Sequence, residues 1–135
     1  MENIKPCWYR VSAKWIIFDE NNNLLLIADE KWQWDLPWGG IEHNEDIFIA
    51  LEREIEEEIW VKVKNIDKQP VFFLTEHKPN SKSRKQVANV FYKVELENYD
   101  IKTSNECSEW KFCDKETAKN LNTYLKLDNL FDLIF

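Results

Sequence analysis

The sequence predicts an α/β fold in which helices pack on a mixed β-sheet. Three observations support this prediction. Short segments rich in β-branched and aromatic residues alternate with polar turn clusters, as is typical of strands. One longer segment, residues 45–59, repeats its apolar side chains at the spacing of a helix. A second amphipathic segment, residues 128–135, follows the last predicted strand, so helices are available to cover the sheet.

The first part of the chain is expected to form a β-hairpin. Arg10–Phe18 is rich in β-branched and aromatic residues, and Leu24–Asp29 is a second apolar run. Between them, Asp19–Asn23 reads DENNN, a cluster of residues that favour turns. Two strand-like runs joined by a short turn cluster predict a hairpin.

The predicted helix runs from about Glu45 to Ile59, with His43 or Asn44 as its N-terminal cap. Acidic residues in its first turn suit the positive end of the helix dipole. At about 100° per residue, four apolar side chains fall within a stripe of roughly 80°. This expected core face consists of Phe48, Leu51, Ile55 and Ile59.

The second half of the chain adds strands and two further helices. Val61–Thr75 is an apolar segment that runs into the polar loop TEHKPNSKSRKQ. Val87–Leu96 then returns as a strand, so we expect these two segments to be antiparallel neighbours. Trp110–Cys113 is predicted to be a short strand, and Lys115–Ala118 the start of a helix. We expect the last helix, Asp128–Phe135, to pack on its own sheet, with a dimer contact as the alternative.

Length and charge limit the possible classes of protein. With 135 residues, the chain has the size of one domain, which we expect to span residues 1–135. Its net charge of -7 argues against a non-specific binder of nucleic acid or membrane surfaces. The N-terminus lacks a signal-peptide pattern, and no run approaches the roughly 20 apolar residues that span a bilayer. We therefore expect a cytoplasmic protein without a membrane partner, and the oligomeric state stays open.

Acidic side chains occupy both flanks of the expected core face. Glu52 and Glu56 lie on one flank, where a solvated surface explains them. Glu54, Glu57 and Glu58 lie together on the other flank. Like charges three or four residues apart destabilise a helix by roughly 0.2–0.5 kcal/mol each. A hard divalent cation such as Mg²⁺, which binds carboxylate oxygens, would remove this repulsion, but the crowding alone is weak evidence for such a site.

The spacing of individual residues makes the prediction specific. From Gly39 to Val61 the chain reads GGIEHNEDIFIALEREIEEEIWV. This segment resembles the Nudix box, G-x5-E-x7-R-E-U-x-E-E-x-G-U, in which U is apolar. Every fixed position matches except the second glycine, which is Trp60 in this chain. The flanking Leu36-Pro37 and Gly40–Glu42 also look like the family's approach to the box. The resemblance implies a Nudix-like α/β/α sandwich with a mixed β-sheet.

The resemblance also implies a chemistry. It is hydrolysis of a nucleoside diphosphate linked to some further moiety, by attack of water at phosphorus, with Mg²⁺ or Mn²⁺ as cofactor. Glu54 and Glu58 would be the main metal ligands, and Glu57 a further ligand. The backbone carbonyl of Trp38 would be another ligand. Glu54 is also a candidate general base. The expected partner is a nucleotide-like small molecule, and nucleic acid is not expected.

Five further residues receive roles outside the main ligand set. Some family members take their base from a loop glutamate, and Glu106 lies in a similar register as a second candidate base. By the same resemblance, Arg53 and Glu45 would orient the glutamates and the loop. Arg84 and Lys85 are candidates for contact with a substrate phosphate. The sequence does not choose between a nucleoside triphosphate, ADP-ribose and a dinucleoside polyphosphate as substrate.

Two rival functions are considered beside the hydrolase. The first is a non-catalytic nucleotide sensor on the same fold, and the complete set of box glutamates argues against it. The second is an RNA-binding or decapping role. Its only support is the cationic loop HKPNSKSRKQ, which contains Lys78, Lys82, Arg84 and Lys85. Short charged loops are more often simply solvated.

The tryptophans are unexpected. The chain has 2 glycines and 7 tryptophans, whereas average glycine usage of about 7% predicts roughly nine glycines. Several tryptophans stand where a small residue or a family glycine is expected. These are Trp15, Trp32, Trp38, Trp60 and Trp110. We hypothesise that they mark codons that the source organism reads as glycine. The alternative is that they are true aromatic residues used for base stacking or core filling, as Trp34 in QWDLP is expected to be.

Overall fold

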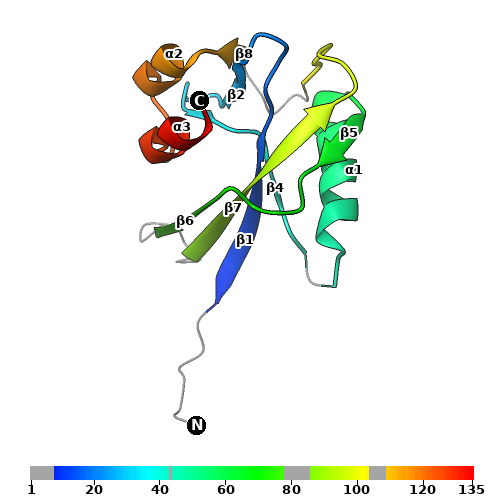
Figure 1. The fold of residues 1–135 in the computed structure, drawn as a ribbon. Helices are drawn as coiled ribbons and strands as arrows, with labels where there is room; N and C mark the ends of the chain where they lie inside the picture. The colour runs from blue at the N-terminus through cyan, green and yellow to red at the C-terminus, as the bar shows by residue number, and fades with distance from the viewer. Residues whose placement is uncertain (1–7, 43, 78–85, 104–108) are drawn as a thin grey trace.

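The computed structural model describes residues 8–42, 44–77, 86–103 and 109–135 (Figure 1). The strands are β1 (Tyr9–Ile16), β2 (Leu24–Ala28), β3 (Trp34–Asp35), β4 (Trp38–Gly40), β5 (Val63–Ile66), β6 (Phe72–His77), β7 (Gln86–Leu96) and β8 (Glu109–Cys113). The helices are α1 (Ile47–Ile59), α2 (Lys115–Asn120) and α3 (Asp128–Ile134). Within the described ranges, no helix is long and apolar enough to cross a membrane.

The strands form two sheets between helical layers. The larger sheet has the order β4-β1-β7-β5, with β6 also paired to β7. Strands β1 and β7 are parallel, whereas the other pairs in this sheet are antiparallel. The smaller sheet has the order β3-β2-β8. Helix α1 lies on one side of the larger sheet, and α2 and α3 lie on the other (Figure 1). The predicted mixed sheet with helices packed on it is confirmed.

Alternation along β1 divides the core into two clusters. Successive side chains of a strand point to opposite faces of the sheet. Trp15 therefore packs toward α1, in a cluster with Leu51 and Ile55. Ile16 points the other way and joins Phe131 of α3. Each such buried side chain contributes roughly 1.5–3 kcal/mol to stability, so β1 fixes the helical layers on both faces.

The predicted hairpin between the first two strands is present at its turn. One carboxylate oxygen of Asp19 accepts hydrogen bonds from the backbone N–H groups of Asn21 and Asn23, both at 2.9 Å. The Leu25 N–H then donates to the Ile17 carbonyl at 2.9 Å. Beyond this point the strands separate, because β1 pairs with β4 and β7 while β2 pairs with β3 and β8. The turn is thus formed by residues close together in the chain, whereas β1 and β2 pair mainly with strands from more distant segments.

The predicted start of the main helix was wrong by two residues. Helix α1 begins at Ile47, and its cap is Asp46, which accepts hydrogen bonds from two backbone N–H groups of the first turn at 3.0 and 3.1 Å. Asn44, one of the two expected caps, has a φ of 64° in a left-handed turn. The other, His43, lies outside the described residues. Glu45 lies before the helix, where its side chain accepts a hydrogen bond from the Glu42 N–H.

Other strand and helix predictions hold with changed boundaries. The apolar segment Val61–Thr75 contains two strands, β5 and β6, and both are antiparallel to β7 as expected for this region. The short strands β3 and β4 were not predicted. Strand β8 and helices α2 and α3 occur at the expected places. Leu130 and Phe131 of α3 are fully buried, so this helix packs on its own sheet as predicted.

Candidate functional site

The core face of α1 holds the acidic side of the helix in a fixed orientation. Leu51, Ile55 and Ile59 are fully buried, as the helical stripe predicts. Phe48 is partly buried at the edge of this face, where its ring meets that of Tyr92 edge-on at 5.6 Å. Because these contacts fix the rotation of the helix, its glutamates cannot turn toward the core.

Glu54 lies against the backbone of strand β4. A Cβ atom added to Gly39 would stand 2.7 Å from a carboxylate oxygen of Glu54 and 3.5 Å from the Trp15 ring. The φ of Gly39 is not in the left-handed region. A glycine at this position therefore permits the close approach of the Glu54 side chain and is not needed for an unusual backbone angle. The first glycine of the box therefore makes room for the first of its metal-binding candidates.

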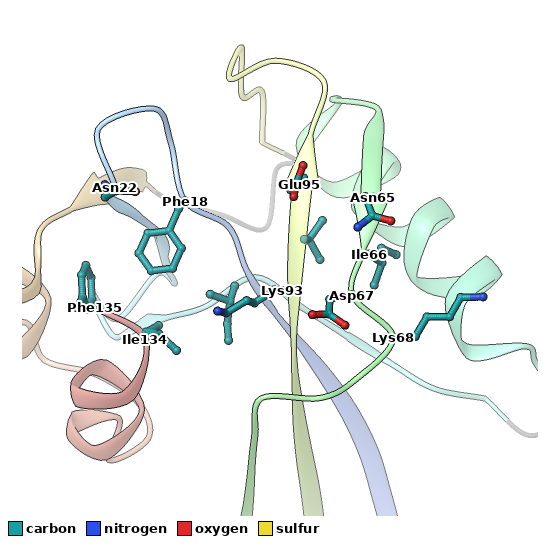
Figure 2. A pocket seen from close by; sticks show the side chains of 12 residues that line it. Phe18, Asn22, Asn65, Ile66, Asp67, Lys68, Lys93, Glu95, Ile134 and Phe135 are labelled. Carbon is teal, nitrogen blue, oxygen red and sulfur yellow. The ribbon is translucent and has the colours of Figure 1, made fainter.

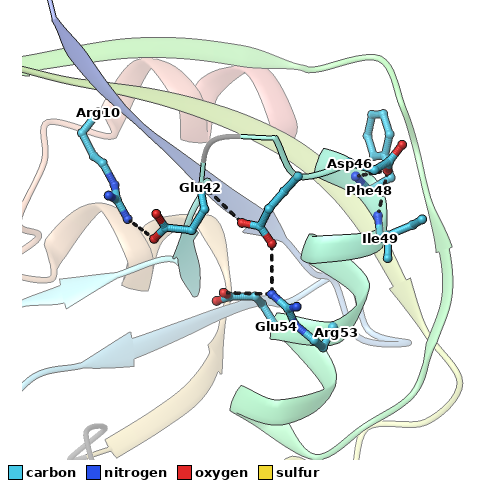
Figure 3. A network of polar contacts seen from close by, with 8 residues as sticks. Arg10, Glu42, Asp46, Phe48, Ile49, Arg53 and Glu54 are labelled. Carbon is cyan, nitrogen blue, oxygen red and sulfur yellow. Dashed lines mark hydrogen bonds and ion pairs between the residues drawn. The ribbon is translucent and has the colours of Figure 1, made fainter.

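A network of polar contacts joins this carboxylate to the loop before the helix (Figure 3). Arg53 Nη2 lies 3.2 Å from one oxygen of Glu45 and 3.8 Å from an oxygen of Glu54. The other Glu45 oxygen accepts a hydrogen bond from the Glu42 N–H at 2.9 Å. Arg10 of β1 reaches the Glu42 carboxylate at 2.9 Å. The arrangement links β1, the loop and α1 through alternating charges.

Burial and neighbouring charges act on Glu54 in opposite directions. Burial raises the pKa of the Glu54 carboxyl above its usual range, and Arg53 works against that rise. Repulsion from three other carboxylates raises this pKa further; they are Glu57, Glu45 and Glu58. Glu57 is exposed, and Glu58 is partly buried. A cation bound at this surface in addition to Arg53 would favour the ionised form of Glu54.

Carboxylate oxygens are the donors that Mg²⁺ and Mn²⁺ prefer. In the described part of the chain, no three His, Cys, Asp or Glu side chains are already gathered closely enough to hold a metal ion. Mg²⁺ keeps several of its waters and is usually bound through only one or two carboxylates together with substrate phosphates. The donor set on α1 therefore fits this type of cation by its chemistry.

Several predicted site residues lie elsewhere or outside the described residues. Glu106, Arg84 and Lys85 are outside the described residues. Trp38 is the first residue of β4, and about half of its surface is exposed. Its ring is 5.3 Å from the ammonium of Lys14. Of the predicted residues, the structure thus brings Glu45, Arg53 and Glu54 into direct contact.

Glu56 is not only a solvated residue, as the sequence had suggested. Its carboxylate accepts a hydrogen bond from the Val63 N–H at 3.4 Å, at the start of β5. Glu52, on the same flank, is exposed as expected. One of the two glutamates on this flank therefore helps to anchor the chain after the helix.

A buried ion pair between β1 and β3 was missed in the sequence. Lys14 Nζ lies 2.5 Å from Asp35 Oδ2, and only 3% and 8% of these residues are exposed. Burial raises the pKa of the Asp35 carboxyl, while the charge of Lys14 and its hydrogen bond lower it. Within the described residues, the nearby strand residues Ser12 and Asn89 each have a buried side-chain oxygen without a hydrogen-bond partner. A lysine inside an apolar strand was the signal that could have revealed this pair.

A cavity of about 700 Å³ lies away from the box glutamates (Figure 2). Its walls come from the end of α3, the turn after β1, and strands β5 and β7, with Phe18 and Phe135 on one side and Lys93 between them and β5. No box glutamate lines it. The candidate site is therefore the group of carboxylates on α1 and not this cavity.

Substituting Gly39→Ala tests the close approach of Glu54. The new methyl group would push the end of a flexible side chain, so we expect the protein to fold with a stability loss below about 1 kcal/mol. Turnover should nevertheless fall about 10–100-fold, because the displaced carboxylate loses its position. Gly40→Ala is the matched control, since its Cβ would meet the Arg10 guanidinium instead. Equal losses in both variants, measured by steady-state kinetics and thermal melting, would contradict this account.

Comparison with known proteins agrees with the fold and the family. The family model for the NUDIX domain matches residues 8–133. An RNA pyrophosphohydrolase of Pelagibacter ubique (strain HTCC1062) is 29% identical over 127 residues, covering 83% of this chain and 80% of that protein. The MutT protein of Methanosarcina mazei Go1 has a similar structure, with a TM-score of 0.73, 20% identity, and coverage of 92% of this chain and 91% of that chain. The E. coli dihydroneopterin triphosphate pyrophosphohydrolase is also similar, with a TM-score of 0.72, 16% identity, and coverage of 92% and 94%.

Proposed function

Because this chain belongs to the NUDIX domain family and is a pyrophosphohydrolase of that type, we propose that it cleaves the diphosphate linkage of a nucleoside diphosphate derivative with Mg²⁺ or Mn²⁺. The whole of residues 1–135 would form a single domain for this task. The observation that carries the proposal is the Glu54 carboxylate, held against Gly39 and bordered by Arg53 and further glutamates.

In this proposal, Glu54 and Glu58 hold the metal, with Glu57 and the carbonyl of Trp38 as further ligands. When bound, such a cation neutralises the diphosphate and lowers the pKa of a water molecule. Positioning and charge compensation supply most of the catalysis of phosphoryl transfer, so the protein needs little covalent chemistry. Helix α1 meets that need, because its buried core face fixes the helix and all three carboxylates lie on it.

The other residues have supporting roles. Arg53 would hold Glu54, and Glu45 would orient Arg53 and the loop; the contacts of Arg53 with both carboxylates and of Glu45 with the Glu42 N–H support these roles. Glu54 is the first candidate for the group that accepts a proton from the attacking water. Glu106 is the alternative base. Arg84 and Lys85 would contact a substrate phosphate.

The substrate class is tested by a panel. We would measure release of phosphate, pyrophosphate or nucleoside monophosphate from nucleoside triphosphates, ADP-ribose and dinucleoside polyphosphates, each with Mg²⁺, with Mn²⁺ and with excess chelator. A short RNA with a triphosphate end belongs in the panel because the Pelagibacter relative is named for RNA. Glu58→Gln is the inactive control. We expect chelator-sensitive turnover of at least one nucleotide that this substitution abolishes.

Each other outcome of the panel has a definite meaning. Metal-dependent binding of a nucleotide without turnover would contradict the hydrolase and favour the sensor. Turnover of RNA ends alone would reassign the substrate from a small molecule to nucleic acid. A salt series would then separate the two modes of binding, because contacts to many phosphates make affinity fall steeply with salt.

A further inference from the structure

Two tryptophans have a backbone conformation that belongs to glycine. Among the described residues, four other than glycine have a positive φ near 60°: Asn22, Trp32, Asn44 and Trp60. Asparagine enters this left-handed region with moderate ease, whereas a bulky side chain there is a strained outlier. The φ angles of Trp32 and Trp60 are 59° and 61°. Strain of this kind needs a compensating interaction.

The indole rings provide no such compensation through burial. Trp60 is 70% exposed and Trp32 is 58% exposed. Large apolar side chains stabilise a fold by leaving water, and these two largely remain in water. The side chains therefore do not explain why the backbone adopts this conformation at either position.

Backbone hydrogen bonds do explain it. At the end of α1, the Trp60 N–H donates to the Glu56 carbonyl at 3.0 Å, which is how a left-handed glycine ends a helix. In the turn before β3, the Trp32 N–H donates to the Asp29 carbonyl at 3.1 Å. The Asp29 carboxylate fixes the same turn by accepting two further backbone hydrogen bonds. Both turns require a left-handed residue whatever its side chain.

The glycines that the chain has are not used for this purpose. Both stand together in β4, and neither has a positive φ. Every left-handed position in the described ranges is thus filled by asparagine or tryptophan. A chain of this length that uses glycine at none of its left-handed turns departs from ordinary turn chemistry.

From these observations we infer that positions 32 and 60 are glycine in the protein that the source organism makes, because its translation reads the corresponding codons as glycine. The inference does not extend by this argument to Trp15, Trp38 or Trp110, whose φ angles are not left-handed. Trp15 is fully buried in the α1 cluster, which supports core filling at that position. The inference is independent of the proposed catalytic activity, since it concerns backbone strain alone.

Thermal melting of single variants tests the conformational part. Trp32→Gly and Trp60→Gly should each melt about 2–4 °C above the matching alanine variants, which remove the indole but keep the strained Cβ. Trp8→Gly is the control, because this exposed tryptophan has no left-handed φ and glycine there should not exceed alanine. Glycine variants that melt no higher than the alanine variants would overturn the inference.

Mass spectrometry of the natural protein tests the translation itself. Peptides that cover positions 32 and 60, from protein isolated from the source organism, should be lighter than the tryptophan-containing peptides by the difference between the two residues. Peptides of the glycine mass at both positions support the inference. A tryptophan mass at either position overturns it, whatever the melting temperatures.

Discussion

Replacing Glu54 by glutamine is expected to reduce turnover by about 100-fold or more without loss of stability. In the proposed mechanism this carboxylate is both a metal ligand and the first candidate base, and a positioned general base alone contributes roughly 10²–10⁴-fold. Glu54 is also repelled by Glu57, Glu45 and Glu58. Removing one of these mutually repelling charges should leave the folded state as stable as before, or more stable by roughly 0.2–0.5 kcal/mol.

Glu52→Gln is the matched control for this prediction. It makes the same change of charge on the same helix, but at an exposed position on the opposite flank. We expect it to keep full turnover and the same dependence on Mg²⁺ concentration. Steady-state kinetics, with melting curves recorded in parallel, checks both variants. If Glu54→Gln retained more than about a tenth of the activity, Glu54 would be neither an essential ligand nor the base.

Substituting Lys14→Met is expected to destabilise the protein by about 3–5 kcal/mol. The change leaves the Asp35 carboxylate buried without its cation, and the cost of an uncompensated buried charge is large. For a chain of this size, the melting temperature should fall by about 10 °C or more. Chemical denaturation gives the same free energy independently, provided that the slope with denaturant is unchanged.

The pH dependence and a double variant identify the cause of this loss. Burial raises the pKa of Asp35, and removing Lys14 removes the chief opposing influence. A carboxyl whose pKa is higher in the folded than in the unfolded state favours folding below its unfolded pKa, and that stability is lost as the pH rises through the folded pKa. The loss in Lys14→Met should therefore shrink as the pH is lowered toward 4, with 3.8 as the reference value for Asp35.

The double variant Lys14→Met/Asp35→Leu should recover most of the stability, since apolar replacements of a buried ion pair are often neutral or stabilising. A double variant as unstable as Lys14→Met would show that packing around position 14, and not an unpaired charge, causes the loss. The difference between the double and single variants measures the coupling of the pair.

Local features of this protein follow from the sequence alone. The spacing from Gly39 to Val61 identified the family, and the burial of Leu51, Ile55 and Ile59 followed from helical periodicity. The turn at Asp19 also followed from residue type. Each of these features depends on residues close together in the chain, where backbone geometry fixes which side chains share a face or a turn.

Only the tertiary structure decided the contacts between distant segments. It paired β1 in parallel with β7, and it placed Gly39 of an unpredicted edge strand beside Glu54 of the helix. It also buried Lys14 against Asp35. Composition and period do not fix such contacts, because many strand orders and registers bury the same apolar faces equally well. The box sequence thus determined which groups are available for chemistry, whereas the packing of β4 on β1 and α1 determined how Glu54 is held.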